Sequence, residues 1–209
     1  MPNANAIGIS PAKLEFNFAP NAKFNCDFLI VNNVWEGIDG EDLDVLIETG
    51  EELKDYITIE RSEATLPPNQ WIPVKCSINL PDNLKPGPNY GSILLKEASA
   101  STGGMVGTVA AVKMPITIRV PYPGKYLEGT FEIPTVEVGQ KVEFRINVIN
   151  RGDQNIDEAY SVIEVYDLNQ NKLTEVTSDH MPILSGQQVN IISYWDAEDI
   201  GAGIYHAKA

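Results

Sequence analysis

The chain contains an internal repeat in which two ten-residue segments align without a gap at an offset of 118 positions, from Lys23 to Lys141. Residues 23–32 read KFNCDFLIVN and residues 141–150 read KVEFRINVIN. An apolar side chain at every second residue is typical of a strand with one buried face. The repeat therefore predicts two copies of one β unit. The matched inward pairs are Phe24 with Val142, Cys26 with Phe144, Phe28 with Ile146 and Ile30 with Val148.

The match extends beyond this strand. After a deletion of three residues in the second copy, Tyr90 aligns with Tyr205, each just after a glycine-containing turn. A tyrosine at such a place buries its ring and bonds its hydroxyl to loop backbone, the tyrosine corner of Greek-key sandwiches. We predict that role for both residues. At the original offset, the other matches are Asp39 with Asp157 in a loop and Leu66 with Leu184 before a later strand.

Strand-like runs fill much of the remaining chain, and no long stretch shows a helical period. The 14 prolines and 16 glycines are spread along the sequence. Hydrophobic residues make up 43% of the chain, which is enough to form a core. We predict an all-β chain of two tandem immunoglobulin-like Greek-key sandwiches, residues 1–122 and 123–209, that meet at the Pro and Gly cluster of residues 121–124. The other expected strands are residues 45–47, 56–59, 72–80, 90–95 and 106–120.

The two copies differ after their aligned tyrosines. Tyr90 is followed by enough residues for a long last strand at 106–120, whereas four residues follow Tyr205. We therefore expect the second sandwich to lack its last strand, which leaves an open sheet edge. Two explanations stay open: the chain is a piece of a longer protein, or another chain supplies the strand, such as residues 7–16 of a second copy.

The order of these motifs resembles the tandem immunoglobulin-like domains of bacterial and archaeal surface proteins, the NPCBM-associated and CARDB repeats. The first copy, with LPPN at 66–69 and PGPNYG at 86–91, also resembles the immunoglobulin-like domain of WxL-associated cell-wall proteins. More loosely, it is similar to the N-terminal domain of periplasmic pilus chaperones. The resemblance implies a cell-surface or secreted structural or adhesion module, a spacer and interaction scaffold with a protein, cell-wall or glycan partner.

Charge and hydropathy exclude several partners. With 15 Lys and Arg against 29 Asp and Glu, the net charge is −14, which disfavours nucleic acids and anionic membrane surfaces. The sequence contains no run of about 18 apolar residues, so no membrane-spanning helix is predicted. The small polar residues 1–6 are typical of what remains after signal-peptide cleavage, and the alternative is the native end of a cytosolic chain. We predict an extracellular or cell-surface location.

The two cysteines lie on strands that are neighbours in a sandwich of this order. A disulfide between Cys26 and Cys76 is one interpretation, since secretion would permit it. The other is a pair of separate buried thiols, because the second copy has Phe144 in place of Cys26. Neither cysteine has a neighbouring His in the sequence, so we do not expect catalysis from them.

Several acidic stretches are candidates for calcium binding. Residues 167–171 place oxygen side chains at alternate positions, but Lys172 and Ser178 stand where a calcium loop needs Gly and Glu. We therefore predict a hairpin turn there. The acidic residues 39–44 and 153–158 occupy the same loop of each copy, and we interpret them as solvated loops.

The three tryptophans suggest either a core role or a sugar-stacking surface. Trp71 and Trp195 occur once per copy in corresponding regions, which favours packing in the core or at the seam between the two domains. Trp35 lies beside an acidic loop, where a core needs it less, and is the candidate for stacking on a carbohydrate.

No catalytic set is evident. His180 and His206 have no partners that would complete a Ser-His-Asp or Cys-His arrangement, the carboxylates are dispersed, and no glycine-rich loop cradles phosphate. We predict a non-enzyme with no catalytic, cofactor-binding or metal-binding residues and no cofactor. A structural or adhesion module is the first expectation. The alternatives are a carbohydrate or cell-wall binding module and a strand-exchanging chaperone or pilin-like subunit that self-associates.

Overall fold

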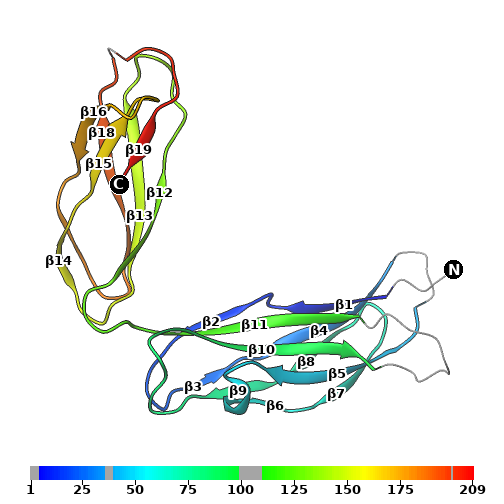
Figure 1. Ribbon diagram of the computed structural model, residues 1–209. Coiled ribbons are helices and arrows are strands. Elements are labelled where there is room, and N and C mark those ends of the chain that lie inside the picture. Colours follow the sequence, from blue (N-terminus) through cyan, green and yellow to red (C-terminus); the bar gives the residue numbers. More distant parts are fainter. Residues whose placement is uncertain (1–4, 36–39, 99–109, 199) are drawn as a thin grey trace. The chain divides into compact units, whose positions relative to one another are not determined.

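The computed structural model describes residues 5–35, 40–98, 110–198 and 200–209. Regular structure in these residues is β-strand, apart from the 3₁₀ turn η1 (Lys54–Tyr56). The contacts divide the chain into two compact units, Met1–Val120 and Pro121–Ala209 (Figure 1). The prediction of an all-β chain built from immunoglobulin-like sandwiches is confirmed. That the units fold independently, with the boundary at residue 122, stays a prediction.

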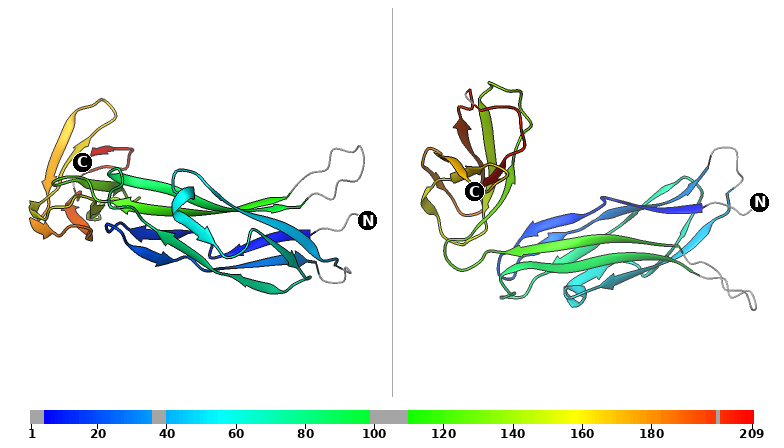
Figure 2. Two further views of the ribbon diagram at one scale, coloured as in Figure 1. Left: turned by 90° about the horizontal axis from the view of Figure 1, so that it is seen from below. Right: turned by 45° about the horizontal axis from the view of Figure 1, so that its top comes forward.

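The first unit has two layers. One is the sheet β2–β11–β10–β5–β7, and the other is formed by β1–β4–β8 with β3–β9–β6. Figure 2 shows that the β10–β11 hairpin, coloured green, runs along the length of this unit. The strands are β1 (Asn5–Ser10), β2 (Leu14–Asn17), β3 (Lys23–Asn25), β4 (Phe28–Val34), β5 (Leu43–Gly50), β6 (Ile57–Ile59), β7 (Glu63–Leu66), β8 (Trp71–Val74), β9 (Cys76–Asn79), β10 (Gly87–Glu97) and β11 (Ala111–Val120).

Strand β11 closes the core of the first unit. Its inward residues Met114, Ile116 and Ile118 are fully buried between the layers. Removing each such side chain from water contributes about 1.5–3 kcal/mol. The strand pairs antiparallel with β10 on one side and parallel with β2 on the other. Both edges of β11 are therefore hydrogen-bonded.

The second unit has fewer paired strands. Its sheets are β12–β13–β18, β14–β17 and β16–β15–β19. The buried side chains form two smaller clusters, one around Phe144 and one around Ile183. The strands are β12 (Leu127–Glu132), β13 (Val142–Asn150), β14 (Ile156–Ala159), β15 (Val162–Tyr166), β16 (Lys172–Thr177), β17 (Met181–Ile183), β18 (Gln188–Trp195) and β19 (His206–Lys208).

A buried asparagine occupies the same place in both units. Asn32 donates its side-chain amide to the carbonyl oxygens of Leu66 (3.3 Å) and Glu41 (3.0 Å). Asn150, which is 118 positions later, donates to the carbonyls of Ile183 (3.2 Å) and Gln154 (2.8 Å). Both asparagines are fully buried. The repeat is therefore preserved in its buried hydrogen bonds as well as in its apolar pattern.

These bonds correct one part of the sequence alignment. Leu66 and Ile183 are both fully buried and accept the equivalent bond, whereas Leu184 is 55% exposed. The predicted match of Leu66 with Leu184 is therefore wrong by one residue. The identical residue type misled the alignment, because the segment between the two strands is one residue shorter in the second unit.

The tyrosine corner is formed by Tyr205, whose hydroxyl donates to the carbonyl of Gly201 at 2.7 Å. The same prediction for Tyr90 is wrong, since this side chain is 49% exposed. Its neighbour Asn89 is buried and donates its side-chain amide to the carbonyl of Lys85 at 2.9 Å, also four residues back. Asn89 in β10 is thus the counterpart of Tyr205, which immediately precedes β19.

Residues 122–126 dock on the loop at 151–154 within the second unit. A Cβ at Gly152 would lie 2.1 Å from the carbonyl oxygen of Gly124 and 2.7 Å from the amide nitrogen of Tyr126. Both are backbone atoms, so only glycine allows this approach. The backbone hydrogen bonds run from Tyr122 N to Arg151 O (2.8 Å), from Arg151 N to Tyr126 O (2.8 Å) and from Gln154 N to Gly124 O (3.2 Å).

We expect Gly152→Ala to lower the free energy of unfolding of the second unit by about 1–3 kcal/mol, the usual cost of overpacking. Urea unfolding followed by Trp fluorescence measures this change. Gly201→Ala is the matched control, because a Cβ there meets nothing within 4 Å. Equal stability of the two variants would contradict the close approach.

Candidate functional site

Strand β19, red in Figure 1, has a neighbouring strand on one side only within the described residues. It pairs antiparallel with β15, with Ala207 opposite Val165. Its counterpart β10 lies between β5 and β11. Equivalence of β10 and β19 follows from the shared hydrogen bond of Asn89 and Tyr205 to the residue four positions back. The free side of β19 is therefore the side that β11 covers in the first unit.

Residues 133–138 bound the same region from the other sheet. Strands β1 and β12 correspond, since each pairs antiparallel with the repeated strand, β4 or β13. After β1 the first unit continues into β2, which pairs with β11. After β12 the second unit continues into residues 133–138, which form no strand in the described structure. Val138 is 62% exposed there.

An apolar cleft of about 400 Å³ is lined by residues 133–140 and 200–207. Its deeper wall includes Phe144 and Val165, both buried, and the partly buried Trp195. The rings of Trp195 and Tyr205 meet edge to face with their centroids 6.3 Å apart. A cleft of this composition suits apolar side chains, and the polar backbone of β19 lies at its rim.

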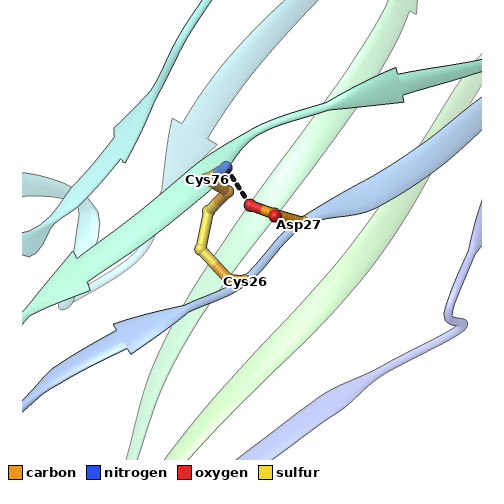
Figure 3. Close-up of a disulfide and its surroundings, with 3 residues drawn as sticks. All are labelled: Cys26, Asp27 and Cys76. Carbon is orange, nitrogen blue, oxygen red and sulfur yellow. Dashed lines mark hydrogen bonds between the residues drawn. A yellow bond between two sulfur atoms is a disulfide. The ribbon is translucent and has the colours of Figure 1, made fainter.

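Cys26, which lies between β3 and β4, forms a disulfide with Cys76, the first residue of β9 (Figure 3). The two residues lie opposite each other between the β3–β9 and β4–β8 pairings. Cys26 donates its amide to the carbonyl of Cys76 at 2.9 Å, and the amide of Cys76 donates to Oδ1 of Asp27 at 2.9 Å. The carboxylate of Asp27 therefore accepts a hydrogen bond of the kind that a backbone carbonyl accepts in a regular sheet. Of the two interpretations, the disulfide is the correct one.

The acidic stretches make internal contacts in the described residues. Asp167 accepts bonds from the backbone and side chain of Asn171, which lower the pKa of its carboxyl and close a hairpin turn, as predicted. Asp157 bonds to Lys125, which lowers the pKa of this carboxyl. Asp39 lies outside the described residues. No group of three or more His, Cys, Asp or Glu in the described part of the chain could hold a metal ion.

The tryptophans lie in three different settings. Trp35 is 70% exposed and Trp71 is 53% exposed, both in the first unit, so the packing role predicted for Trp71 is wrong. Trp195 lines the cleft of the second unit. The sugar-stacking role of Trp35 stays a prediction.

The two histidines lie in different places in the second unit. His180 contacts Glu158, with Nδ1 2.5 Å from Oε1, and stacks on Tyr160 with ring centroids 4.3 Å apart. His206 lies on β19 and lines the cleft. Within the described residues, the fold contains no helix with the length and hydrophobicity needed to span a membrane.

Comparison of the sequence with family models and with curated proteins finds no match. In fold, the chain is similar to solved structures of low sequence identity. One is a protein of unknown function from Porphyromonas gingivalis W83, with 16% identity over 93% of this chain and 84% of that chain and a TM-score of 0.43. Another is the E. coli chaperone DraB, with 10% identity over 90% and 86% and a TM-score of 0.42.

A third similar structure is the Salmonella enterica SafA pilin in complex with the SafB chaperone. Here the identity is 10% over 91% of this chain and 85% of that chain, with a TM-score of 0.44. Chaperones are thus among the solved structures to which this chain is similar, at 10% identity. The likeness to surface-protein repeats and to WxL-associated domains stays a prediction.

Proposed function

We propose that this protein is a non-catalytic binding protein that accepts an extended segment of a partner protein as an added strand along β19. The observation that carries the proposal is the cleft beside this strand, which in the first unit is filled by β11. Strand addition draws affinity from main-chain hydrogen bonds and specificity from alternate side chains that enter pockets. The second unit offers both a free strand edge and an apolar cleft.

This function differs from that of a spacer. A spacer needs closed sandwiches, whereas an open edge beside exposed apolar residues exposes a binding surface. Ile204, at the rim of the cleft, is 70% exposed. The second of the two sequence-based alternatives, strand exchange, is therefore favoured over the adhesion module.

The Cys26–Cys76 disulfide supports an oxidising compartment as the place of action. Disulfides persist in secreted, periplasmic and cell-surface proteins and are rare in the cytosol. We therefore place the proposed binding activity outside the cytoplasm. Its partner would be met there as an unfolded or extended segment.

The test appends the ten residues of β11 (Ala111–Val120) to the end of the full chain through a short Gly-Ser linker. A flexible tether gives an effective concentration in the millimolar range, so even weak strand addition is populated. We expect the melting temperature of the second unit to rise by about 4–8 °C for each kcal/mol gained. The Trp35→Phe, Trp71→Phe background lets Trp195 report from the cleft.

The control carries the same tail with Asn in place of the residues corresponding to Met114, Ile116 and Ile118. It keeps the backbone donors and acceptors and loses the apolar side chains. Stabilisation by the first tail and not by the second supports strand addition into the cleft. If the first tail leaves both the melting temperature and the fluorescence of Trp195 unchanged, the proposed function is wrong.

A further inference from the structure

We propose that the partner segment is inserted between two flanks, pairing antiparallel with β19 and parallel with residues 133–138. This inference rests on the proposed function and extends it, because simple addition to the edge of β19 needs no second flank. It also assigns the chemistry of the partner: an extended segment with bulky apolar side chains at alternate positions and basic residues between or beside them.

The first flank is defined by the repeat. In the first unit, Ile118 of β11 lies opposite Asn89 of β10, and Ile116 lies opposite Gly91. Tyr205 is the counterpart of Asn89, so an inserted strand places one inward residue opposite Tyr205 and the next opposite Ala207. Both of these side chains already face the cleft. The alternation of β11 is thus the pattern that the cleft accepts.

The second flank follows from the register of the strands. Ile9 pairs with Ile30 in the first unit, and Gly129 pairs with Val148 in the second. Because Ile30 and Val148 match in the repeat, Ile9 matches Gly129. At the same spacing along the chain, Phe16 of β2 falls on Val136.

Phe16 lies opposite Ile118 in the parallel pairing of β2 with β11. It packs partly buried against the first core. Val136 and Val138 line the cleft of the second unit and are exposed. The segment that would pair with an inserted strand is therefore present and positioned at the cleft, with its apolar side chains uncovered. Insertion would bury them and pair both edges of the incoming strand, as in β11.

Charge favours a basic segment. Residues 121–209 contain 6 Lys and Arg against 14 Asp and Glu, and Glu137 lies in the cleft lining. Strand β11, which fills the equivalent place, has Lys113 and Arg119 and no acidic residue. Its Lys113 pairs with Glu51 and its Arg119 with Glu15. Opposite charge on the incoming segment both speeds its encounter and selects against acidic competitors.

A separate protein fits these requirements better than a second copy. Each copy carries a net charge of −14, so two copies repel each other. The segment of residues 7–16, expected from the sequence as a donor, is already in use: Ile7 is buried and β2 is paired with β11. Donation of β1 or β2, the two strands in this segment, would open the first unit. The occupant we infer is therefore a basic, extended segment of another protein.

Hydrogen exchange of the full chain, alone and with the β11 tail, tests the insertion. We expect exchange to slow at least about tenfold both in β19 and in residues 135–138. The variant Val136→Asn, Val138→Asn should weaken binding of a free β11 peptide about tenfold or more, through lost apolar burial without a change of charge. Leu184→Asn, at a comparably exposed leucine outside the cleft lining, should leave binding unchanged. A peptide with Glu in place of its Lys and Arg should bind more weakly.

The outcomes of the exchange experiment separate the insertion, the proposed function and the identity of the occupant. Slower exchange in β19 alone overturns the insertion and leaves the proposed function standing. Unchanged exchange in both flanks, with the tail attached, overturns both. If both flanks are already protected in the dilute chain alone, a segment of this chain closes the cleft and no partner is needed. If that protection appears only at high concentration together with a sedimenting dimer, the occupant is a second copy and the separate partner is wrong.

Discussion

Removal of the Cys26–Cys76 disulfide is expected to lower the free energy of unfolding of the first unit by about 4 kcal/mol. The bond closes a loop with a sequence separation of 50 residues, and the chain-entropy relation assigns about this value to a loop of that length. Both cysteines are buried, so the double variant Cys26→Ala, Cys76→Ala also loses some packing. A small sandwich loses a large share of its total stability by such a change.

Urea unfolding of the oxidised chain and of the double alanine variant measures this effect. If the two units fold independently, only the transition of the first unit should move. Reductant should destabilise the oxidised chain and have no effect on the double variant, which serves as the control. A shift below about 0.5 kcal/mol, the range of ordinary surface changes, would mean that the disulfide does not constrain the unfolded chain. An equal shift of both transitions would contradict the predicted independence of the units.

Asn150→Asp is expected to destabilise the second unit by about 3–5 kcal/mol at neutral pH, the cost of an unpaired buried charge. The amide of Asn150 donates to two carbonyl oxygens at full burial, and its Oδ1 accepts from Gly152 at 3.0 Å. A carboxylate keeps the acceptor and loses both donors, so two carbonyls face a negative charge.

The pH dependence of this variant has a defined sign. Burial beside two carbonyl oxygens raises the pKa of the introduced carboxyl in the folded state above its unfolded value. The stability difference from the parent protein is then smallest in acid and grows as the pH rises through the unfolded pKa. Asn147→Asp is the matched control, since Asn147 lies on the same strand, is only half-buried and bonds to the side chains of Asn190 and Gln188 rather than to buried carbonyls. Similar losses in both variants would show that the buried hydrogen bonds of Asn150 carry little stability.

Much of the fold follows from local pattern. Alternation of apolar residues is a direct consequence of strand geometry, so the repeated segments 23–32 and 141–150 predict matching buried faces without knowledge of any contact. The hairpin at Asp167 is equally local, because an Asp side chain can bond to amides two and four residues ahead. Both predictions hold in the structure.

Which of two adjacent residues faces the core is not decided by local sequence. Asn89 and Tyr90 are neighbours, and the alignment selected the tyrosine because its partner Tyr205 is a tyrosine. Which of the two faces the core depends on the register of β10 against β5 and β11, a contact between distant segments. The match of Leu66 with Leu184 in place of Ile183 has the same cause. A shift of one residue reverses the face of a strand, so residue type alone does not settle such cases.

The sequence by itself determined that this chain forms two β units from one repeated pattern and that the second unit is acidic. Only the tertiary structure decided that Cys26 and Cys76 are bonded. It also decided that residues 133–138, which no motif marks, lie beside the cleft at β19. The physical reason is that periodicity reports how a strand presents its own side chains, whereas pairing and enclosure depend on segments that meet only when the chain is folded.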